Sequence, residues 1–278
     1  MAQDKFSAVW VSHSSMGDFL KCPRLYYLRN VYKDPKTKSK INIVSPHMSL
    51  GVAVHEVLEG LADFSSESRM DRDLLTWFDD VWKKYSGRVG GFKDAMQEEE
   101  FKTRGVTMLE SVKKDPKFLI HKRIKLPREV MNPNFFISDE ENIILNGLID
   151  WIEYIPETNS LHIVDFKTGK KEETENSLQL PIYLLLCNAL QKRKVTKASY
   201  WYLESGKVVE KELPDADTAF RDVLAVALRV KAARTKNKFE CPKGKLGCMH
   251  CIPFEKVLRG EAEFVGTGIF KQDLYFVE

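Results

Sequence analysis

An apolar segment that ends in an acid and a base, residues 161–170 (LHIVDFKTGK), constrains this chain more than any other feature. Its apolar start predicts a buried strand, and Gly169 is expected to end that strand. Asp165 and Lys167 are two positions apart, so their side chains point to the same face. Such a pair suits metal-assisted hydrolysis, because the acid holds a cation while the ammonium orients a water or stabilises a phosphoryl group. A surface ion pair at a strand end has the same signature, so this pair alone does not decide the function.

A second acid lies upstream, in the strand pattern Asn142–Ile155 that Gly147 interrupts. Asp150 stands in the apolar part of this pattern, and acids rarely lie buried without a partner. Residues 156–160 can connect two adjacent strands and so bring Asp150 beside Asp165. Two carboxylates at one point repel each other, and a divalent cation relieves that repulsion.

A third element is the predicted helix over residues 177–190 (SLQLPIYLLLCNAL). Gln179 and Tyr183 are four positions apart and therefore share one face of that helix. Three patterns now stand in order: Gly147-x-x-Asp150, Asp165-x-Lys167-Thr168-Gly169 and Gln179-x-x-x-Tyr183. Together they resemble the PD-(D/E)XK nuclease superfamily in its RecB-like branch. Asp-Phe-Lys stands here where many members have Glu-x-Lys, and both forms occur in the superfamily.

Composition excludes several classes. The chain has 278 residues, 43% hydrophobic and 30% charged, which is enough for one large domain or a core with a satellite. With 43 basic and 40 acidic residues it is not a uniformly basic nucleic-acid coat, so any phosphate-binding charge must be local. No secretory signal or membrane-spanning run is recognised, so we expect an intracellular, cytoplasmic protein of bacterial, archaeal or phage origin without membrane contact. The five cysteines then favour thiols or a metal over disulfides.

Residues 12–32 predict a helix that Ser14 or Ser15 caps and that kinks or restarts at Pro23. Its aromatic and basic residues either grip a nucleic-acid strand or form an aromatic core with solvated arginines: Arg24, Tyr26, Tyr27 and Arg29. The run Ser-x-Ser-x-x-x-x-Phe-x-x-Cys-Pro-x-x-Tyr-Tyr is similar to the N-terminal motif of RecB-like nucleases that carry an iron–sulfur cluster.

The remaining elements are expected as follows: a loop over 33–47, a helix over 49–64, two helices within 70–115 separated at Gly90-Gly91, a strand over 118–130, strands over 135–138 and 142–154 joined by a turn at 139–141, a hairpin of 198–204 and 207–210, and a helix over 214–236. The basic residues of the strand over 118–130, among them Lys122 and Arg123, line either a phosphate track or a wet strand face. His55 alone would be a structural or surface histidine. Gly51-x-x-x-His55 resembles the helix that supplies a histidine metal ligand in the RecB-like branch.

The tail contains three cysteines at metal-ligand spacing: Cys241, Cys248 and Cys251. Cys187 lies in an apolar helix and reads as a small buried hydrophobe, which leaves Cys22 as the fourth thiolate. One distant cysteine plus a C-terminal trio resembles the iron–sulfur site of AddB-like and CRISPR-associated RecB-type nucleases. In this chain the outlier of the trio precedes the C-x2-C pair and no cysteine follows it. Zinc held by four thiolates and unliganded thiols remain alternatives.

The resemblance implies an α/β fold with a restriction-endonuclease-like core, which is a central mixed sheet flanked by helices with a helical insertion. One nuclease domain is expected over 1–278, with a mainly helical part (1–115), a sheet core with the active site (116–212), and a C-terminal helix with the cysteines (213–278). A [4Fe-4S] cluster would join the N- and C-terminal regions. Helices within 70–115 and the last twenty residues carry no motif.

The implied function is a metal-dependent DNA nuclease, an exonuclease on single-stranded DNA or DNA ends. Mg²⁺ or Mn²⁺ would be held by His55, Asp150, Asp165 and the carbonyl of Phe166. Lys167 would orient the water, and Gln179 and Tyr183 would brace the site or contact DNA. The alternative is a DNA-binding or assembly subunit with protein partners in recombination or CRISPR adaptation. A sequence-specific endonuclease is disfavoured because no separate recognition domain is recognised.

Overall fold

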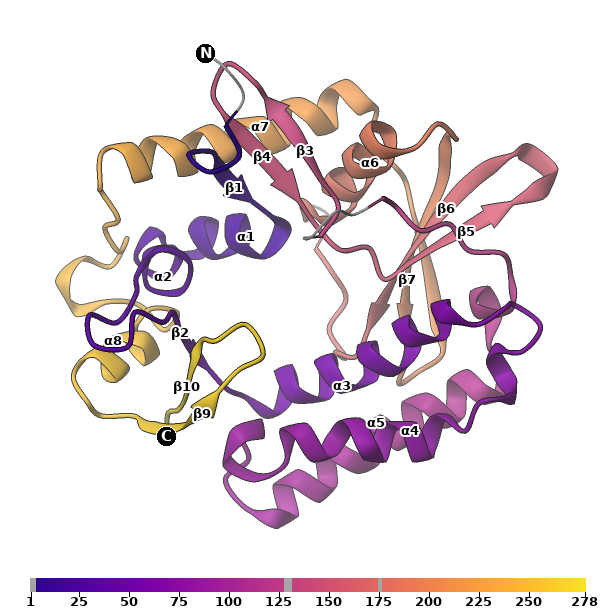
Figure 1. Ribbon diagram of the computed structural model, residues 1–278, viewed down its shortest axis with the longest axis horizontal. Helices are drawn as coiled ribbons and strands as arrows, with labels where there is room; N and C mark the ends of the chain where they lie inside the picture. The colour runs from indigo at the N-terminus through magenta and orange to yellow at the C-terminus, as the bar shows by residue number, and fades with distance from the viewer. Residues whose placement is uncertain (1–3, 128–131, 175–176) are drawn as a thin grey trace.

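A four-stranded sheet carries the segment that ends in Asp165 and Lys167 (Figure 1). The computed structural model describes residues 4–127, 132–174 and 177–278. The strands of this sheet stand side by side in sequence order: β5 (Trp151–Ile155), β6 (Ser160–Lys167), β7 (Val195–Tyr202) and β8 (Lys207–Lys211). β6 and β7 run parallel while the other two pairs are antiparallel, so the expected mixed sheet is confirmed.

Side chains alternate between the two faces along each strand, and both faces of the sheet are covered. Ile163 packs toward α6 (Gln179–Leu190) and α7 (Ala216–Thr235). Val164 and Phe166 pack on the other face, in the core that α3 builds. β6 is therefore buried from Ser160 to Phe166, as its apolar sequence predicts.

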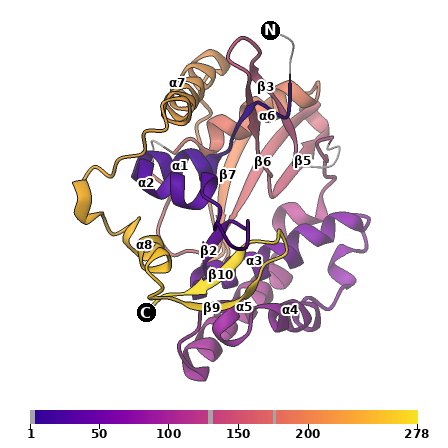
Figure 2. The same ribbon diagram turned by 60° about the vertical axis from the view of Figure 1, so that its left-hand side comes forward.

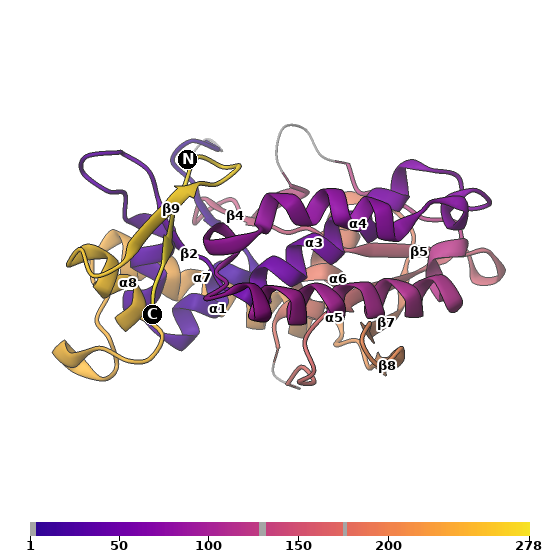
Figure 3. The same ribbon diagram turned by 90° about the horizontal axis from the view of Figure 1, so that it is seen from below.

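Three helices form the second layer below the sheet: α3 (Pro46–Gly60), α4 (Leu74–Trp82) and α5 (Ala95–Lys114) (Figures 1 and 3). The expected helical insertion with a break at Gly90-Gly91 is confirmed, and Gly91 takes φ +82° in close contact with the backbone of Ser45. α3 begins earlier than expected, because Ser45 caps it and Pro46 suits its first turn. Among the described residues, no helix is long and apolar enough to span a bilayer.

The two halves of the pattern Asn142–Ile155 lie in different sheets, and the first half belongs to a small second sheet. It contains β1 (Val9–Val11), β4 (Ile143–Asn146) and β3 (Asn134–Ser138) in that order. β3 and β4 form the expected hairpin, and the chain then leaves this sheet at Gly147 and enters β5 of the main sheet. The interruption at Gly147 is thus a change of sheet.

The expected strand over 118–130 is wrong for its described part. Lys117–Ile120 is a 3-10 turn, followed by a single bridge between Arg123 and Glu153. Only the backbones of Lys122 and Ile124 bond to β5, so the basic segment touches the sheet edge without extending it. Residues 128–130 of that expectation lie outside the described part of the chain.

The N-terminal helix restarts as expected. α1 (His13–Lys21) ends at Cys22, and α2 (Pro23–Tyr26) begins there and continues as a π-helical turn, Tyr27–Val31. The cap differs from the prediction, because Ser12 accepts from the backbone N–H of Ser15 and forms a reciprocal capping box with it.

A third sheet, which was not predicted, joins the C-terminal strands to residues 41–43 of the N-terminal part (Figures 1 and 2). β2 (Ile41–Ile43) lies in a segment expected to be a loop, and it pairs in parallel with β10 (Asp273–Phe276), which also pairs with β9 (Glu263–Thr267). α8 (Ile252–Leu258) packs beside them. The last twenty residues therefore tie the C-terminus to the N-terminal region through backbone hydrogen bonds.

Candidate active site

The antiparallel register of β5 and β6 brings the two predicted acids together. Trp151 stands opposite Val164, so Asp150 and Asp165 lie at the same end of the strand pair. Both side chains are buried, and Oδ2 of Asp150 accepts a hydrogen bond of 2.7 Å from the backbone N–H of Phe166. The expected meeting of two carboxylates is thus present in the structure.

His55 reaches this point from α3. Its Nδ1 lies 2.8 Å from the carbonyl oxygen of Gly51, which can only accept, so Nδ1 carries a hydrogen. Its Nε2 lies 3.2 Å from Oδ2 of Asp150 and 3.1 Å from the carbonyl oxygen of Phe166. In the neutral ring these three atoms present only lone pairs to one another, and such a convergence needs a positive charge.

Electrostatics give the same result. Burial lowers the pKa of His55, but the carboxylate of Asp150 outweighs it and raises that pKa to about 10. Burial, and then the negative charge of Asp150, raise the pKa of Asp165 to about 7, while Lys167 opposes the shift. One imidazole nitrogen, two carboxylates and a carbonyl are a donor set that Mg²⁺ or Mn²⁺ fits.

Lys167 and the helix α6 fix the orientation of Asp165. Oδ1 of Asp165 accepts hydrogen bonds of 2.7 Å from Nε2 of Gln179 and 3.1 Å from the hydroxyl of Tyr183. Lys167 Nζ donates at 2.7 Å to Oε1 of Gln179 and lies 2.9 Å from Oδ2 of Asp165. That Oδ2 atom is buried and accepts no well-aligned hydrogen bond from the described residues. The ammonium of Lys167 is therefore the cation that faces this oxygen in the structure.

Three residues that the sequence did not single out as site residues also lie here. Glu59 follows His55 by one turn of α3, and burial and the charge of Asp150 raise its pKa to about 7. Glu173 accepts a hydrogen bond of 3.1 Å from Lys167 Nζ. His13 begins α1, and burial and the positive charge of Lys167 lower its pKa. The one-turn spacing of His55 and Glu59 could have revealed Glu59, whereas no local pattern marks the other two.

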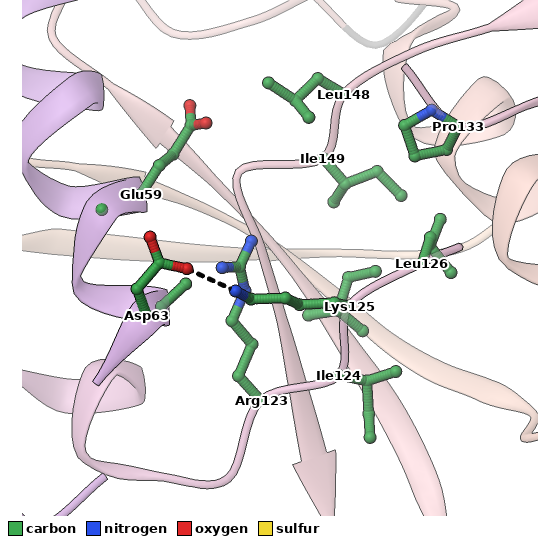
Figure 4. Close-up of a pocket in the computed structure, with 12 residues that line it drawn as sticks. Glu59, Asp63, Arg123, Ile124, Lys125, Leu126, Pro133, Leu148 and Ile149 are labelled. Carbon is green, nitrogen blue, oxygen red and sulfur yellow. Dashed lines mark hydrogen bonds and ion pairs between the residues drawn. The ribbon is translucent and has the colours of Figure 1, made fainter. Parts of the chain in front are cut away.

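A pocket of about 360 Å³ opens beside Glu59 (Figure 4). Lys125 and Asp63 form an ion pair of 2.6 Å across it, and the apolar residues Leu148 and Ile149 line the other wall. Arg123 also lines it and donates a hydrogen bond of 3.1 Å to the carbonyl oxygen of Asp150. Residues 122–125 therefore support the site through backbone hydrogen bonds to β5 and through the hydrogen bond from Arg123 to Asp150.

The predicted nucleic-acid contacts fall into two separate groups. Arg123 lies at the carboxylate site, and Nζ of Lys122 lies over the ring of Tyr154. The others lie in the N-terminal helices: Arg24 pairs with Glu255, Arg29 pairs with Asp18, Tyr27 packs on Phe239, and Tyr26 is buried.

The second candidate site is formed by the four cysteines that the sequence analysis grouped together as metal ligands. The Sγ atoms of Cys22, Cys241, Cys248 and Cys251 all lie within 4.8 Å of one another. Burial opposes thiolate formation, but nearby backbone N–H groups of Cys251 and His250 lower the pKa of Cys248 to about 7. Cys187 is buried elsewhere, in α6. The four thiols can therefore hold a metal.

Their spacing bears on which metal. A tetrahedral zinc with Zn–S bonds of about 2.3 Å places its sulfurs about 3.8 Å apart. The Sγ atoms of Cys248 and Cys251 lie 3.8 Å apart, which matches one ion. A cubane cluster holds its four thiolates further apart than these sulfur atoms, which all lie within 4.8 Å of one another.

Comparison with known proteins agrees with this geometry. No curated protein matches the chain. A family model described as the PD-(D/E)XK nuclease superfamily matches residues 10–254. The matched range contains the two-carboxylate site, the helix with Gln179 and Tyr183, and all four clustered cysteines. Since it covers most of the sequence, this chain belongs to the PD-(D/E)XK nuclease superfamily.

Proposed function

We propose that this chain is a RecB-like, metal-dependent deoxyribonuclease that degrades single-stranded DNA or DNA from its ends. Superfamily membership implies a metal-dependent nuclease. The observation that carries the proposal further is the convergence of Nε2 of His55, Oδ2 of Asp150 and the carbonyl oxygen of Phe166 on one point beside Asp165 and Lys167.

Mg²⁺ or Mn²⁺ would be held by His55, Asp150, Asp165 and the Phe166 carbonyl. When bound, it supplies Lewis acidity toward a phosphoryl oxygen and a more acidic water. The protein holds the donor atoms ready, because Gly51 fixes the ring of His55 and the backbone N–H of Phe166 fixes Asp150. Such preorganisation lowers the reorganisation that the reaction requires.

Lys167 acts as a cation and hydrogen-bond donor. Burial opposes its charge, but Asp165 and then Glu173 raise its pKa, so the amino group stays protonated at neutral pH. It can orient the attacking water and stabilise negative charge on the phosphate. Gln179 bridges Lys167 and Asp165, so it positions the acid and the base of the pair together.

Tyr183 holds Asp165 from the far side. Burial and the charges of Asp165 and Asp150 raise its pKa well above the usual value, so the hydroxyl keeps its proton. It therefore serves as a donor to Asp165 and not as a base. Gln179 and Tyr183 thus brace the site.

The proposed biological setting is DNA repair, recombination, phage DNA metabolism or CRISPR adaptation, with protein partners in recombination or CRISPR adaptation. The competing function is a DNA-binding or assembly subunit with little cleavage. Both carboxylates and Lys167 are present and buried or nearly so, and maintaining such a set without a catalytic use is costly. This favours the enzyme.

End-labelled single-stranded DNA and its duplex form test the proposal. Purified protein should shorten the single strand from an end in Mn²⁺ or Mg²⁺, and a chelator or Asp165→Asn should stop it. Circular single-stranded DNA should resist a strict exonuclease. Binding without cleavage in every metal would identify the assembly subunit instead.

A further inference from the structure

A basic groove lies beside α1, and none of the described residues that line it belongs to the carboxylate site. Its volume is about 950 Å³, and it is bounded by β1, α1, the π-helical turn, the ends of β3 and β4, and the last turn of α7. No Asp or Glu is among the described residues that line it, although acidic and basic residues are nearly equal in the whole chain. The bias toward positive charge is therefore local.

Three cations define one end of this groove: Lys33, Lys40 and Arg234. Within the described ranges none of the three forms an ion pair with a carboxylate. Partial burial, and then the charges of Lys33 and Arg234, lower the pKa of Lys40. Cations that are brought together without acids repel one another, and an anion between them removes that cost.

The other end of the groove approaches the active site. Ser12 lines it, and the next residue, His13, is close enough to Lys167 for the charge of Lys167 to lower its pKa. Asn146 also lines it and ends β4, four positions before Asp150. Through the segments that follow Ser12 and Asn146, the groove therefore adjoins the carboxylate site.

The walls between these ends suit nucleotides better than a small inorganic anion. Trp10 lines the groove with its side chain partly exposed and Phe6 at the rim is fully exposed, whereas the ring of Tyr26 is buried against Phe19 and Phe239. Asn30, Asn134 and Asn146 add amide donors and acceptors. Basic grooves with aromatic platforms bind single strands, whose unpaired bases expose the faces that stack.

We propose that this groove binds the backbone of single-stranded DNA and leads the strand to Asp165 and Lys167. The inference rests on the proposed function, because it names the path by which that site receives its substrate. The main phosphate contacts are then Lys33, Lys40 and Arg234. Arg24 and Arg29 no longer have this role, because their guanidinium groups are already paired with acids.

Fluorescence anisotropy of a labelled oligothymidylate, without added divalent metal, measures the effect. For a single strand each phosphate contact contributes a slope of about −0.7 to log K against log salt. The triple variant Lys33→Gln, Lys40→Gln, Arg234→Gln should make the slope shallower by about 2. It should also weaken binding roughly 100-fold near 0.1 M salt. Phe6→Ala should weaken it about five-fold or more through lost stacking.

A matched variant controls for net charge. Lys192→Gln, Lys194→Gln, Lys197→Gln removes three exposed cations at the start of β7, whereas Asp165 and Lys167 lie opposite the end of that strand. It should keep affinity within about two-fold, since these residues are outside the groove. Equal losses in both triple variants, or none in the groove variant, would overturn the inference.

A small substrate separates this inference from the proposed function. Bis(p-nitrophenyl) phosphate reaches only the metal site, so the groove variant should hydrolyse it at the wild-type rate in Mn²⁺ while losing activity on long strands. Loss of both activities would show that the groove variant damages the site. If the wild-type protein binds oligothymidylate through the groove but hydrolyses neither substrate, the groove stands and the nuclease proposal fails.

Discussion

Nε2 of His55 lies 3.2 Å from Oδ2 of Asp150, across 95 positions of sequence. The contact exists because α3 packs on the face of the sheet that carries Phe166, at the end where β6 meets the start of β5. Nδ1 of His55 bonds to the carbonyl oxygen of Gly51, so the ring cannot turn away. A proton or a metal ion must therefore occupy the region between the nitrogen and the facing oxygens.

Asp165→Ala and Lys167→Ala should each abolish cleavage while leaving the fold intact. Each removes an interaction with the reacting groups, so kcat should fall about 100-fold or more. Single-turnover cleavage of end-labelled DNA measures this loss, with circular dichroism as the test of folding. Lys197→Ala, on the adjacent strand and exposed, should keep the wild-type rate. A folded variant of either site residue with near wild-type turnover would refute the assignment of the active site.

His55→Gln should weaken the metal site specifically. Loss of one nitrogen donor should raise the Mn²⁺ concentration for half-maximal cleavage about 10-fold or more. Calorimetric titration with Mn²⁺ gives the same quantity without turnover. His47→Gln is the matched control, because His47 lies exposed on the same helix and packs on Phe101. Equal Mn²⁺ requirements in the two variants would contradict a ligand role for His55.

The centre of the site could be predicted because it depends on local patterns. Strand periodicity places Asp165 and Lys167 on one face, and helix periodicity places Gln179 and Tyr183 on one face. Once β5 and β6 pair through a short connection, the position of Asp150 follows. His55 required the family resemblance, since a lone helical histidine has no distinguishing pattern.

The parts that could not be predicted depend on packing between distant segments. Ile41 and Ile43 form a strand only because β10 pairs with them. Glu173 and His13 join the site through the fold of a loop and the direction of α1. Residues 118–127 have a strand-like pattern, but the chain bonds to β5 over too short a length to form one.

Stability should depend on pH through Glu153. Burial raises its pKa, but hydrogen bonds from His162 and then His121 outweigh this and lower it. A depressed folded pKa gives stability that is fully present above the unfolded value of about 4.3 and is lost as pH falls through the folded value. Glu153→Gln should cost about 1–3 kcal/mol at pH 7, and this cost should shrink below about pH 4.

Urea unfolding of both proteins between about pH 7 and pH 3 measures this difference. Glu157→Gln, an exposed neighbour in the β5–β6 connection, is the control and should show almost no difference at any pH. If the loss of unfolding free energy in Glu153→Gln stays constant with pH, then the shape of the Glu153 side chain, and not its charge, stabilises its contacts with His162 and His121.

The four clustered cysteines should hold a metal that stabilises the fold. Cys22 joins the tail cysteines by closing a loop over most of the chain, which restrains the unfolded state, although the gain grows only with the logarithm of loop length. The free energy of metal binding therefore also contributes to the free energy of folding. Cys22→Ser should lose the metal and most soluble protein, whereas Cys187→Ser, buried in α6, should keep the metal.

Metal analysis of anaerobically purified protein identifies the group. The proposed cluster predicts brown protein with about four irons and matching sulfide per chain. Colourless protein with one zinc per chain would replace the cluster by a single ion, which the 3.8 Å separation of the Cys248 and Cys251 sulfurs fits directly, and would leave the link between the chain ends intact. Protein without either metal, and equally stable after Cys22→Ser, would exclude both, because the third sheet and its apolar neighbours would then suffice to join the ends.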